Sequence, residues 1–105
     1  RPNVKESACS PAYSLKTALQ ARNAKVALHD PMFTPNEIQK HGFEPGRPDG
    51  QDIIILNTAH PEYAKLDFAR LAKAGTKIIL DGRDFWTQTD VEAHGIKYLC
   101  IAHPY

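Results

Sequence analysis

The sequence predicts an α/β domain of Rossmann-like fold, with a mainly parallel sheet and helices on both faces. Two segments carry this prediction, Asp52–Asn57 and Lys77–Asp81, because each holds a run of aliphatic residues that is typical of a strand buried on both faces. Helical segments separate the strands, and this alternation is typical of parallel strands joined by right-handed crossovers. The 105 residues suffice for one such domain, which we assign to residues 1–105.

Local signals predict the elements of the first half. A helix is expected over residues 10–22, because a serine and then a proline stand at its start, and a short strand over 24–29. A capping box begins at Thr34 and starts a second helix, which ends by Gly42. Residues 43–51 contain two Gly and two Pro without periodicity, so we predict a loop there.

The second half alternates in the same way. A helical turn is expected at 61–65, a helix capped by Asp67 follows, and a short helix at 88–94 precedes a last strand at 96–102. The alternation thus opens with a helix, whereas the first strand of a doubly wound sheet normally lies near its centre. We therefore expect the domain to lack its first strand, which would precede Arg1.

Composition and charge argue against several classes of protein. Lys and Arg number 13 against 12 Asp and Glu, and no basic stripe occurs, so nucleic acid is not expected as a partner. No apolar run approaches the about 20 residues that span a bilayer, and no signal peptide is present, so a membrane is not expected either. Cys9 and Cys100 form neither a disulfide framework nor a zinc pattern. We predict buried free thiols and a cytoplasmic protein.

Polar residues follow the predicted strands, at the edge where open α/β sheets bind ligands. Asp81-Gly82-Arg83 is the best candidate among them. Gly82 permits a sharp turn, and Arg83 would present a fork of donors that suits a phosphate. The same spacing also allows a surface salt bridge from Arg83 to Asp81 or Asp84, and spacing alone slightly favours that alternative.

Two more residues are candidates at this edge. Ser10 could offer its hydroxyl and the free N–H groups of a helix start to an anion, or act as a plain helix cap. His60 could hydrogen-bond a ligand or cap the turn at Pro61. The cap is the favoured interpretation of both. No nucleophile, base and orienting residue can be assembled, and no Gly-x-Gly-x-x-Gly motif occurs, so we predict no catalytic residue, no metal site and no cofactor bound by this chain.

In their order, these motifs resemble the C-terminal, UDP-binding domain of the UDP-glucose/GDP-mannose dehydrogenase family. The segments that are similar to family motifs lie along the whole chain: Arg1-Pro2-Asn3, Ser10-Pro11-Ala12, Asn23–Val26, His29-Asp30-Pro31, Thr58–Tyr63, Asp81-Gly82-Arg83 and Ile96–Leu99. Arg1 stands in the place of a family lysine. The family's Asp-x-Arg-x-Ser-Pro stretch is replaced by Val4–Ala8, so the chain resembles a divergent branch.

The resemblance implies a parent enzyme with an N-terminal NAD-binding domain and a central dimerisation region, hence a homo-oligomer. Such enzymes oxidise the 6-hydroxyl of a UDP-sugar or related sugar nucleotide to a carboxylate, in two NAD-dependent steps through a cysteine thiohemiacetal. The motif of that cysteine is absent from this chain, so the domain alone is predicted to be inactive. The resemblance also implies that the cations at Arg1 and Arg83 help to hold the substrate.

Two other hypotheses stay open from the sequence. One is a free-standing nucleotide-binding or regulatory α/β module. The other is a small hydrolase that uses His60 or Asp81. The residues encoded upstream of Arg1 would separate the first from a dehydrogenase domain, and turnover by the isolated domain would be needed to support the second.

Overall fold

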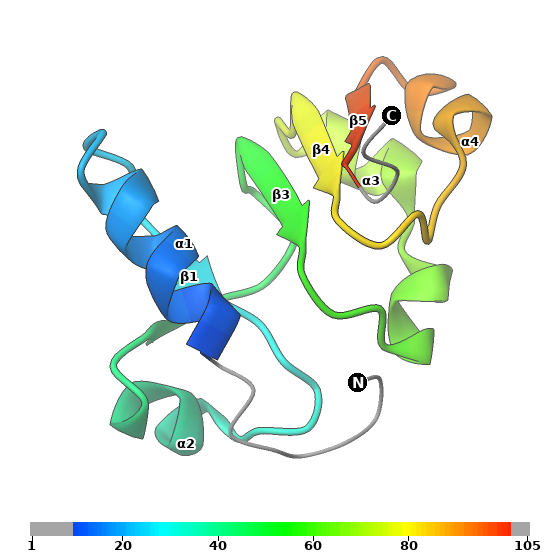
Figure 1. The fold of residues 1–105 in the computed structure, drawn as a ribbon. Coiled ribbons are helices and arrows are strands. Elements are labelled where there is room, and N and C mark those ends of the chain that lie inside the picture. The colour runs from blue at the N-terminus through cyan, green and yellow to red at the C-terminus, as the bar shows by residue number, and fades with distance from the viewer. Residues whose placement is uncertain (1–9, 102–105) are drawn as a thin grey trace. The chain divides into compact units, whose positions relative to one another are not determined.

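The computed structural model describes residues 10–101, with side chains from Ala12 onward. Helices alternate with short strands along this part of the chain (Figure 1). The residues fall into two compact units, one that extends to Arg47 and one that starts at Pro48. Each unit contains its own parallel sheet and its own hydrophobic core.

The unit that extends to Arg47 holds two helices and two short strands. They are α1 (Ser10–Gln20), β1 (Ala27–Leu28), α2 (Pro35–Lys40) and β2 (Glu44–Pro45). The predicted capping box is confirmed at α2. The Thr34 hydroxyl accepts a hydrogen bond from the Glu37 N–H at 3.2 Å, and the Glu37 carboxylate accepts one from the Thr34 N–H at 2.9 Å. Ala12, Ile38 and Phe43 form the buried core of this unit.

The prediction of a loop over 43–51 was wrong at its start, because Glu44–Pro45 forms β2. This strand pairs in parallel with β1, with Ala27 opposite Glu44. The pairing continues into Gly46, whose N–H donates to the Leu28 carbonyl at 2.9 Å. A Cβ on Gly46 would lie 2.5 Å from the Ala27 Cβ, so this glycine marks a close approach of two backbones.

The unit that starts at Pro48 contains the remaining elements. They are β3 (Ile53–Leu56), the 3-10 helix η1 (Pro61–Lys65), α3 (Phe68–Lys73), β4 (Ile78–Asp81), α4 (Gln88–Glu92) and β5 (Lys97–Cys100). The strands form one parallel sheet in the order β3-β4-β5, with Leu56 opposite Asp81 and Asp81 opposite Cys100. The predicted α/β class with parallel strands is confirmed.

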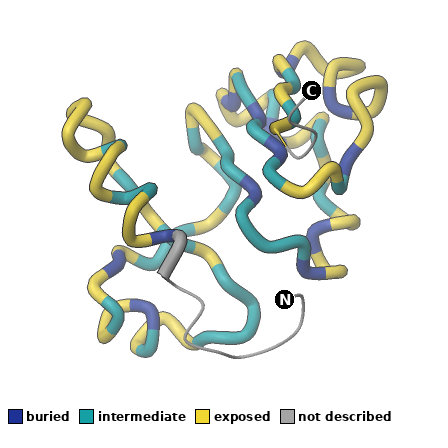
Figure 2. The backbone as a smooth tube through the Cα atoms, in the orientation of Figure 1, coloured by how far each residue is buried: buried dark blue, intermediate teal, exposed yellow. Residues whose placement is uncertain are grey.

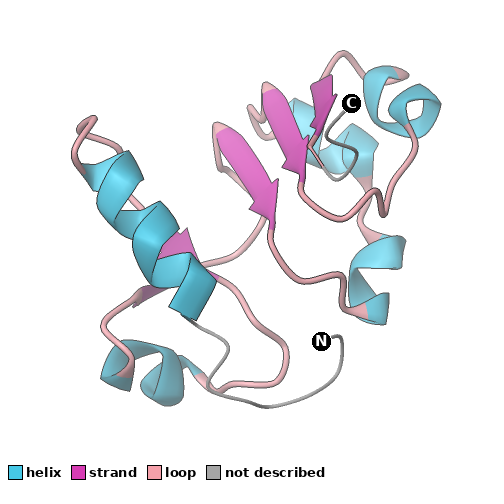
Figure 3. Cartoon of the chain, in the orientation of Figure 1, coloured by secondary structure: helices cyan, strands magenta, loops and turns pink. Residues whose placement is uncertain are grey.

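The two faces of this sheet differ in what covers them within the unit. The helices lie on one side of it (Figure 3), where Leu71 of α3 and Val91 of α4 pack with Leu56 and Ile79. Burial alternates along β4, as a strand with one packed face requires (Figure 2). Residues of the opposite face are more open, and the side chain of Ile53 is 52% exposed.

The strand order within each sheet, taken by itself, can be compared with part of a doubly wound sheet. In the order 3-2-1-4-5-6 of that class, the first strand separates the second from the fourth. The pair β2-β1 corresponds to strands 3 and 2, and β3-β4-β5 corresponds to strands 4, 5 and 6. No strand among residues 10–101 takes the place of the first one.

No helix in the described part is both long and apolar enough to span a bilayer. The same residues contain no group of three or more His, Cys, Asp or Glu side chains that could hold a metal ion.

Candidate functional site

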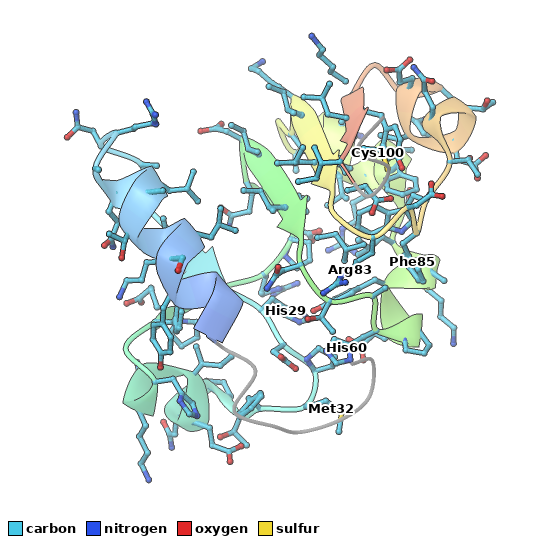
Figure 4. All side chains as sticks on the ribbon, viewed as in Figure 1. His29, Met32, His60, Arg83, Phe85 and Cys100 are labelled. Carbon is cyan, nitrogen blue, oxygen red and sulfur yellow. The ribbon has the colours of Figure 1, made fainter. Side chains whose placement is uncertain are left out.

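The carboxyl ends of β3 and β4 lie side by side, because Leu56 and Asp81 are paired in the sheet. Asn57 follows β3, and Gly82-Arg83 follows β4. The Arg83 side chain is exposed and crosses from one strand end to the other, since its Nε donates to the Asn57 carbonyl at 2.9 Å (Figure 4). The structure thus places Arg83 at the sheet edge where ligands bind in this class of fold.

The Arg83 guanidinium keeps most of its donors for another molecule. A guanidinium carries five N–H groups, and the bond to Asn57 uses the one on Nε. Within residues 10–101, the two Nη nitrogens have no protein partner, and Arg83 forms no ion pair with Asp81 or Asp84. The geometry therefore does not show the surface salt bridge that was the alternative interpretation, and it leaves a fork suited to an anion.

Asp81 is the last residue of β4, two residues before Arg83, and is completely buried, with 0% exposure. Its Oδ1 accepts the N–H of Arg83 at 2.9 Å, and its Oδ2 accepts those of Phe85 and Trp86 at 2.8 and 2.9 Å. The Tyr98 hydroxyl donates to Oδ2 as well, at 2.8 Å. Burial alone raises the pKa of Asp81, but these hydrogen bonds outweigh it and hold the pKa below its ordinary value, so the carboxylate is ionised.

The Tyr98 hydroxyl bridges two groups of the loop that follows β4. It lies 2.8 Å from the Asp81 carboxylate and 2.9 Å from the Trp86 carbonyl oxygen. A phenol has one proton, so it donates to one of these acceptors at a time. Burial, and next the hydrogen bond to Asp81, raise the pKa of Tyr98, so the phenol stays protonated and remains a donor.

Gly82 follows directly after β4, and a glycine is needed there for space. A Cβ on Gly82 would lie 2.7 Å from the Leu56 carbonyl oxygen, to which the Gly82 N–H donates at 3.0 Å. The residue with positive φ is Asp84, at 53°. Aspartate is one of the few residues that tolerate that conformation.

Trp86 fixes the far end of the loop. Its side chain is 7% exposed, and its indole N–H donates to the Tyr63 carbonyl of η1 at 3.0 Å. The ring makes edge-to-face contacts with Phe68 and Phe85, with centroids 5.6 and 5.7 Å apart. The loop that carries Arg83 is therefore anchored to the core at Trp86 and to β5 through Tyr98.

The other predicted site residues are not brought to Arg83 by contacts that the structure describes. His60 is 2% exposed and is the N-cap residue of η1, as predicted, with its carbonyl accepting from the Tyr63 N–H at 2.9 Å, although its side chain makes no capping hydrogen bond. Its ring packs edge-to-face on Tyr63 at 5.8 Å. Ser10 is the first residue of α1, where a helix start was predicted, but its side chain and all of Arg1 lie outside the described residues.

The cysteine prediction holds only in part. Cys100 is a free thiol, but it is half-buried instead of buried, since it ends β5 beside the exposed Asp84. Cys9 lies outside the described residues. The hydrolase hypothesis loses its support, because His60 and Asp81 are both inaccessible to solvent and the Asp81 oxygens already accept hydrogen bonds from the protein.

Sequence reasoning missed Tyr98 as a site residue and treated Asp81 only as an ion-pair partner or a possible hydrolase residue. One signal for Asp81 was present. Aspartate readily accepts hydrogen bonds from backbone N–H groups two residues ahead, and Asp81 is the last residue of a buried strand. No comparable signal exists for Tyr98, because it approaches Asp81 only after β5 pairs with β4.

Comparison with known proteins gives two matches. The family model described as the UDP binding domain of the UDP-glucose/GDP-mannose dehydrogenase family matches residues 1–88, which include Asp81, Arg83 and Trp86. A UDP-glucose 6-dehydrogenase of Rhizobium meliloti (strain 1021) is 29% identical over 111 residues, which cover 99% of this chain and 25% of the relative. The chain thus spans about a quarter of the length of the curated relative that it matches.

Proposed function

Because the chain belongs to the UDP-glucose/GDP-mannose dehydrogenase family, as a UDP-binding domain, we propose that it binds the nucleotide part of a UDP-sugar. We further propose that its parent protein, the longer polypeptide of which the chain would be a part, oxidises the sugar 6-hydroxyl to a carboxylate with NAD. The relative's name, UDP-glucose 6-dehydrogenase, supports this substrate and this position on the sugar.

The Arg83 guanidinium is the observation that carries the binding proposal. Its Nε is fixed to Asn57, and its Nη groups are free of protein partners within the described residues. Such a fork matches the geometry of phosphate oxygens and can form two parallel charge-assisted hydrogen bonds. Arg83 would therefore contact the diphosphate, and Arg1 and Ser10 are proposed as further contacts on the basis of the family resemblance alone.

The NAD site of the parent would lie outside this chain. A dinucleotide site of the Rossmann type needs a glycine-rich turn between a strand and a helix, and no such motif occurs among these 105 residues. NAD would supply the hydride acceptor, and the residues of this chain would bind and orient the substrate. The isolated domain is accordingly proposed to be inactive, and the parent is proposed to be a cytoplasmic homo-oligomer with an N-terminal NAD-binding domain.

Titration of the parent protein with UDP tests the role of Arg83. Arg83→Ala should weaken UDP binding by about 1.5–3 kcal/mol, the range for hydrogen bonds to charged groups, while the melting temperature stays unchanged. Arg70→Ala is the matched control, since Arg70 is an exposed cation of the same unit that lies on α3 and pairs with Asp49 at 2.7 Å. Unchanged affinity in Arg83→Ala would refute the role of Arg83.

The parent reading frame tests the enzymatic part of the proposal. A glycine-rich NAD motif encoded upstream of Arg1, together with formation of NADH from UDP-glucose, would support it. A reading frame without such a motif would favour the free-standing module. Formation of NADH by the 105-residue chain alone would contradict the assignment of catalysis to another part of the parent.

A further inference from the structure

We propose that Asp81 and Tyr98 are positioning residues for phosphate binding, which hold the loop after β4 so that the Arg83 guanidinium is preset for its ligand. The inference rests on the proposed function, because it concerns how that arginine is placed. Neither residue is proposed to touch the nucleotide. Asp81 is fully buried, and the Tyr98 hydroxyl contacts the Asp81 carboxylate and the Trp86 carbonyl.

The loop after β4 converges on one carboxylate. The backbone N–H groups of Arg83, Phe85 and Trp86 all donate to Asp81, at 2.8 to 2.9 Å. These bonds fix the backbone on both sides of Asp84, whose φ of 53° gives the loop its turn. The backbone of the loop is thereby held from Arg83 to Trp86 by a single side chain.

Residue 81 is a buried carboxylate on a packed face of the sheet. Its neighbour in the strand, Ile79, fills the same packed face with an apolar side chain, so core packing alone needs no carboxylate there. Burying an ionised group is costly unless hydrogen bonds compensate it. Every hydrogen bond that the structure gives the Asp81 carboxylate comes from the loop or from Tyr98, so the group specifies the loop conformation.

Tyr98 links the loop to the rest of the sheet. Tyr98 lies on β5, next to β4, and its hydroxyl reaches both Asp81 and the Trp86 carbonyl. It therefore joins the end of β4 to Trp86 at the far end of the loop. A second fixed point is the Arg83 side chain itself, whose Nε is held by Asn57.

The consequence for binding is a smaller entropy loss. A free arginine side chain must be ordered when it meets a phosphate, whereas Arg83 is already fixed at its backbone N–H and at Nε. Buried groups that orient a ligating residue commonly change affinity when they are removed, although they do not contact the ligand. Tyr98 should thus affect phosphate binding only through Arg83.

The test is a double-mutant cycle in the parent protein, with UDP affinity measured by calorimetry for wild type, Tyr98→Phe, Arg83→Ala and the double variant. Tyr98→Phe should weaken UDP binding about fivefold, which corresponds to about 1 kcal/mol. In the Arg83→Ala background the same substitution should change UDP affinity by less than about twofold. Uridine, which has no phosphate, should bind Tyr98→Phe and wild type equally.

Tyr13→Phe is the control, because it removes a phenol of the other unit whose hydroxyl lies 3.5 Å from His41. All affinities are compared below the melting temperature of the least stable variant, as reported by circular dichroism. Tyr98→Phe is preferred to Asp81→Asn because it leaves the three backbone bonds to the carboxylate in place.

Three results would overturn the inference. A folded Tyr98→Phe variant that binds UDP like wild type removes the role of Tyr98. An equal loss in the wild-type and Arg83→Ala backgrounds means that Tyr98 acts apart from Arg83. If Arg83→Ala itself binds UDP normally, the role of Arg83 in the proposed function fails, and positioning fails with it. The first two results leave the proposed function intact.

Discussion

Asp81→Asn is the substitution for which the structure gives the clearest estimate of stability. Asparagine keeps one acceptor oxygen and places an NH₂ group where the second carboxylate oxygen was. With its oxygen at the Oδ2 position, it still accepts from Phe85, Trp86 and Tyr98, but the NH₂ group faces the N–H of Arg83. One charge-assisted bond worth about 1.5–3 kcal/mol is lost and the others become neutral, so the free energy of unfolding should fall by about 3 kcal/mol.

The pH dependence of this difference is a second part of the same prediction. The folded pKa of Asp81 lies below its ordinary value of 3.8, so the ionised form stabilises the folded state. That contribution is fully present above about pH 5 and is lost as the pH falls through the folded pKa. Because Asn does not ionise, the stability difference between wild type and Asp81→Asn should be constant from about pH 7 to about pH 5 and should shrink below about pH 4.

Urea unfolding of the 105-residue chain, followed by the fluorescence of Trp86, measures this difference. Trp86 is the only tryptophan, and it belongs to the same loop as the hydrogen bonds under test. Asp52→Asn is the matched control, since Asp52 is exposed just before β3. A loss in Asp81→Asn no larger than that of Asp52→Asn, or a difference that persists unchanged into strong acid, would refute the argument.

Two further predictions concern single contacts. Gly82→Ala should destabilise the unit that starts at Pro48 by about 2 kcal/mol or more, because its Cβ would meet the Leu56 carbonyl oxygen at 2.7 Å; a melting temperature equal to that of wild type would contradict this. Thr34→Ala should cost about 1 kcal/mol through loss of the bond from the Glu37 N–H, whereas Thr34→Ser should retain most of it. Equal losses in the two Thr34 variants, measured by urea unfolding followed by circular dichroism, would count against the capping box.

The elements predicted correctly are those whose signals are local. Aliphatic runs located β3 and β4, and side chains that accept hydrogen bonds three residues ahead located the starts of α2 and α3. Strand β2 was missed because nothing in Glu44–Pro45 resembles a strand. It exists because β1 lies alongside, with Gly46 close to Ala27, and a contact between segments so far apart has no local signature.

The candidate site divides in the same way. Arg83 could be found from the sequence, because it follows a buried strand and carries the right chemistry for a phosphate. The role of Asp81 depends on a turn at Asp84 with positive φ and on a tyrosine 17 residues later in the chain. Spacing alone slightly favoured an ion pair from Arg83 to Asp81 or Asp84, and only the geometry shows the Asp81 carboxylate turned inward while the guanidinium is exposed.

Within Asp81-Gly82-Arg83, the buried carboxylate and the exposed guanidinium have different tasks, which explains why the three residue types occur together. An exposed arginine on an unconstrained loop would sample many positions and would lose entropy on binding. Asp81 removes that freedom at the backbone, Gly82 lets the loop leave the sheet against the Leu56 carbonyl, and Asn57 fixes the Arg83 Nε. The buried charge is stable only while the loop keeps its hydrogen bonds to it, so the conformation that presents Arg83 is also the one that stabilises the core beneath it. Substitutions that loosen this loop should therefore weaken phosphate binding and lower stability together, whereas Arg83→Ala should change only binding.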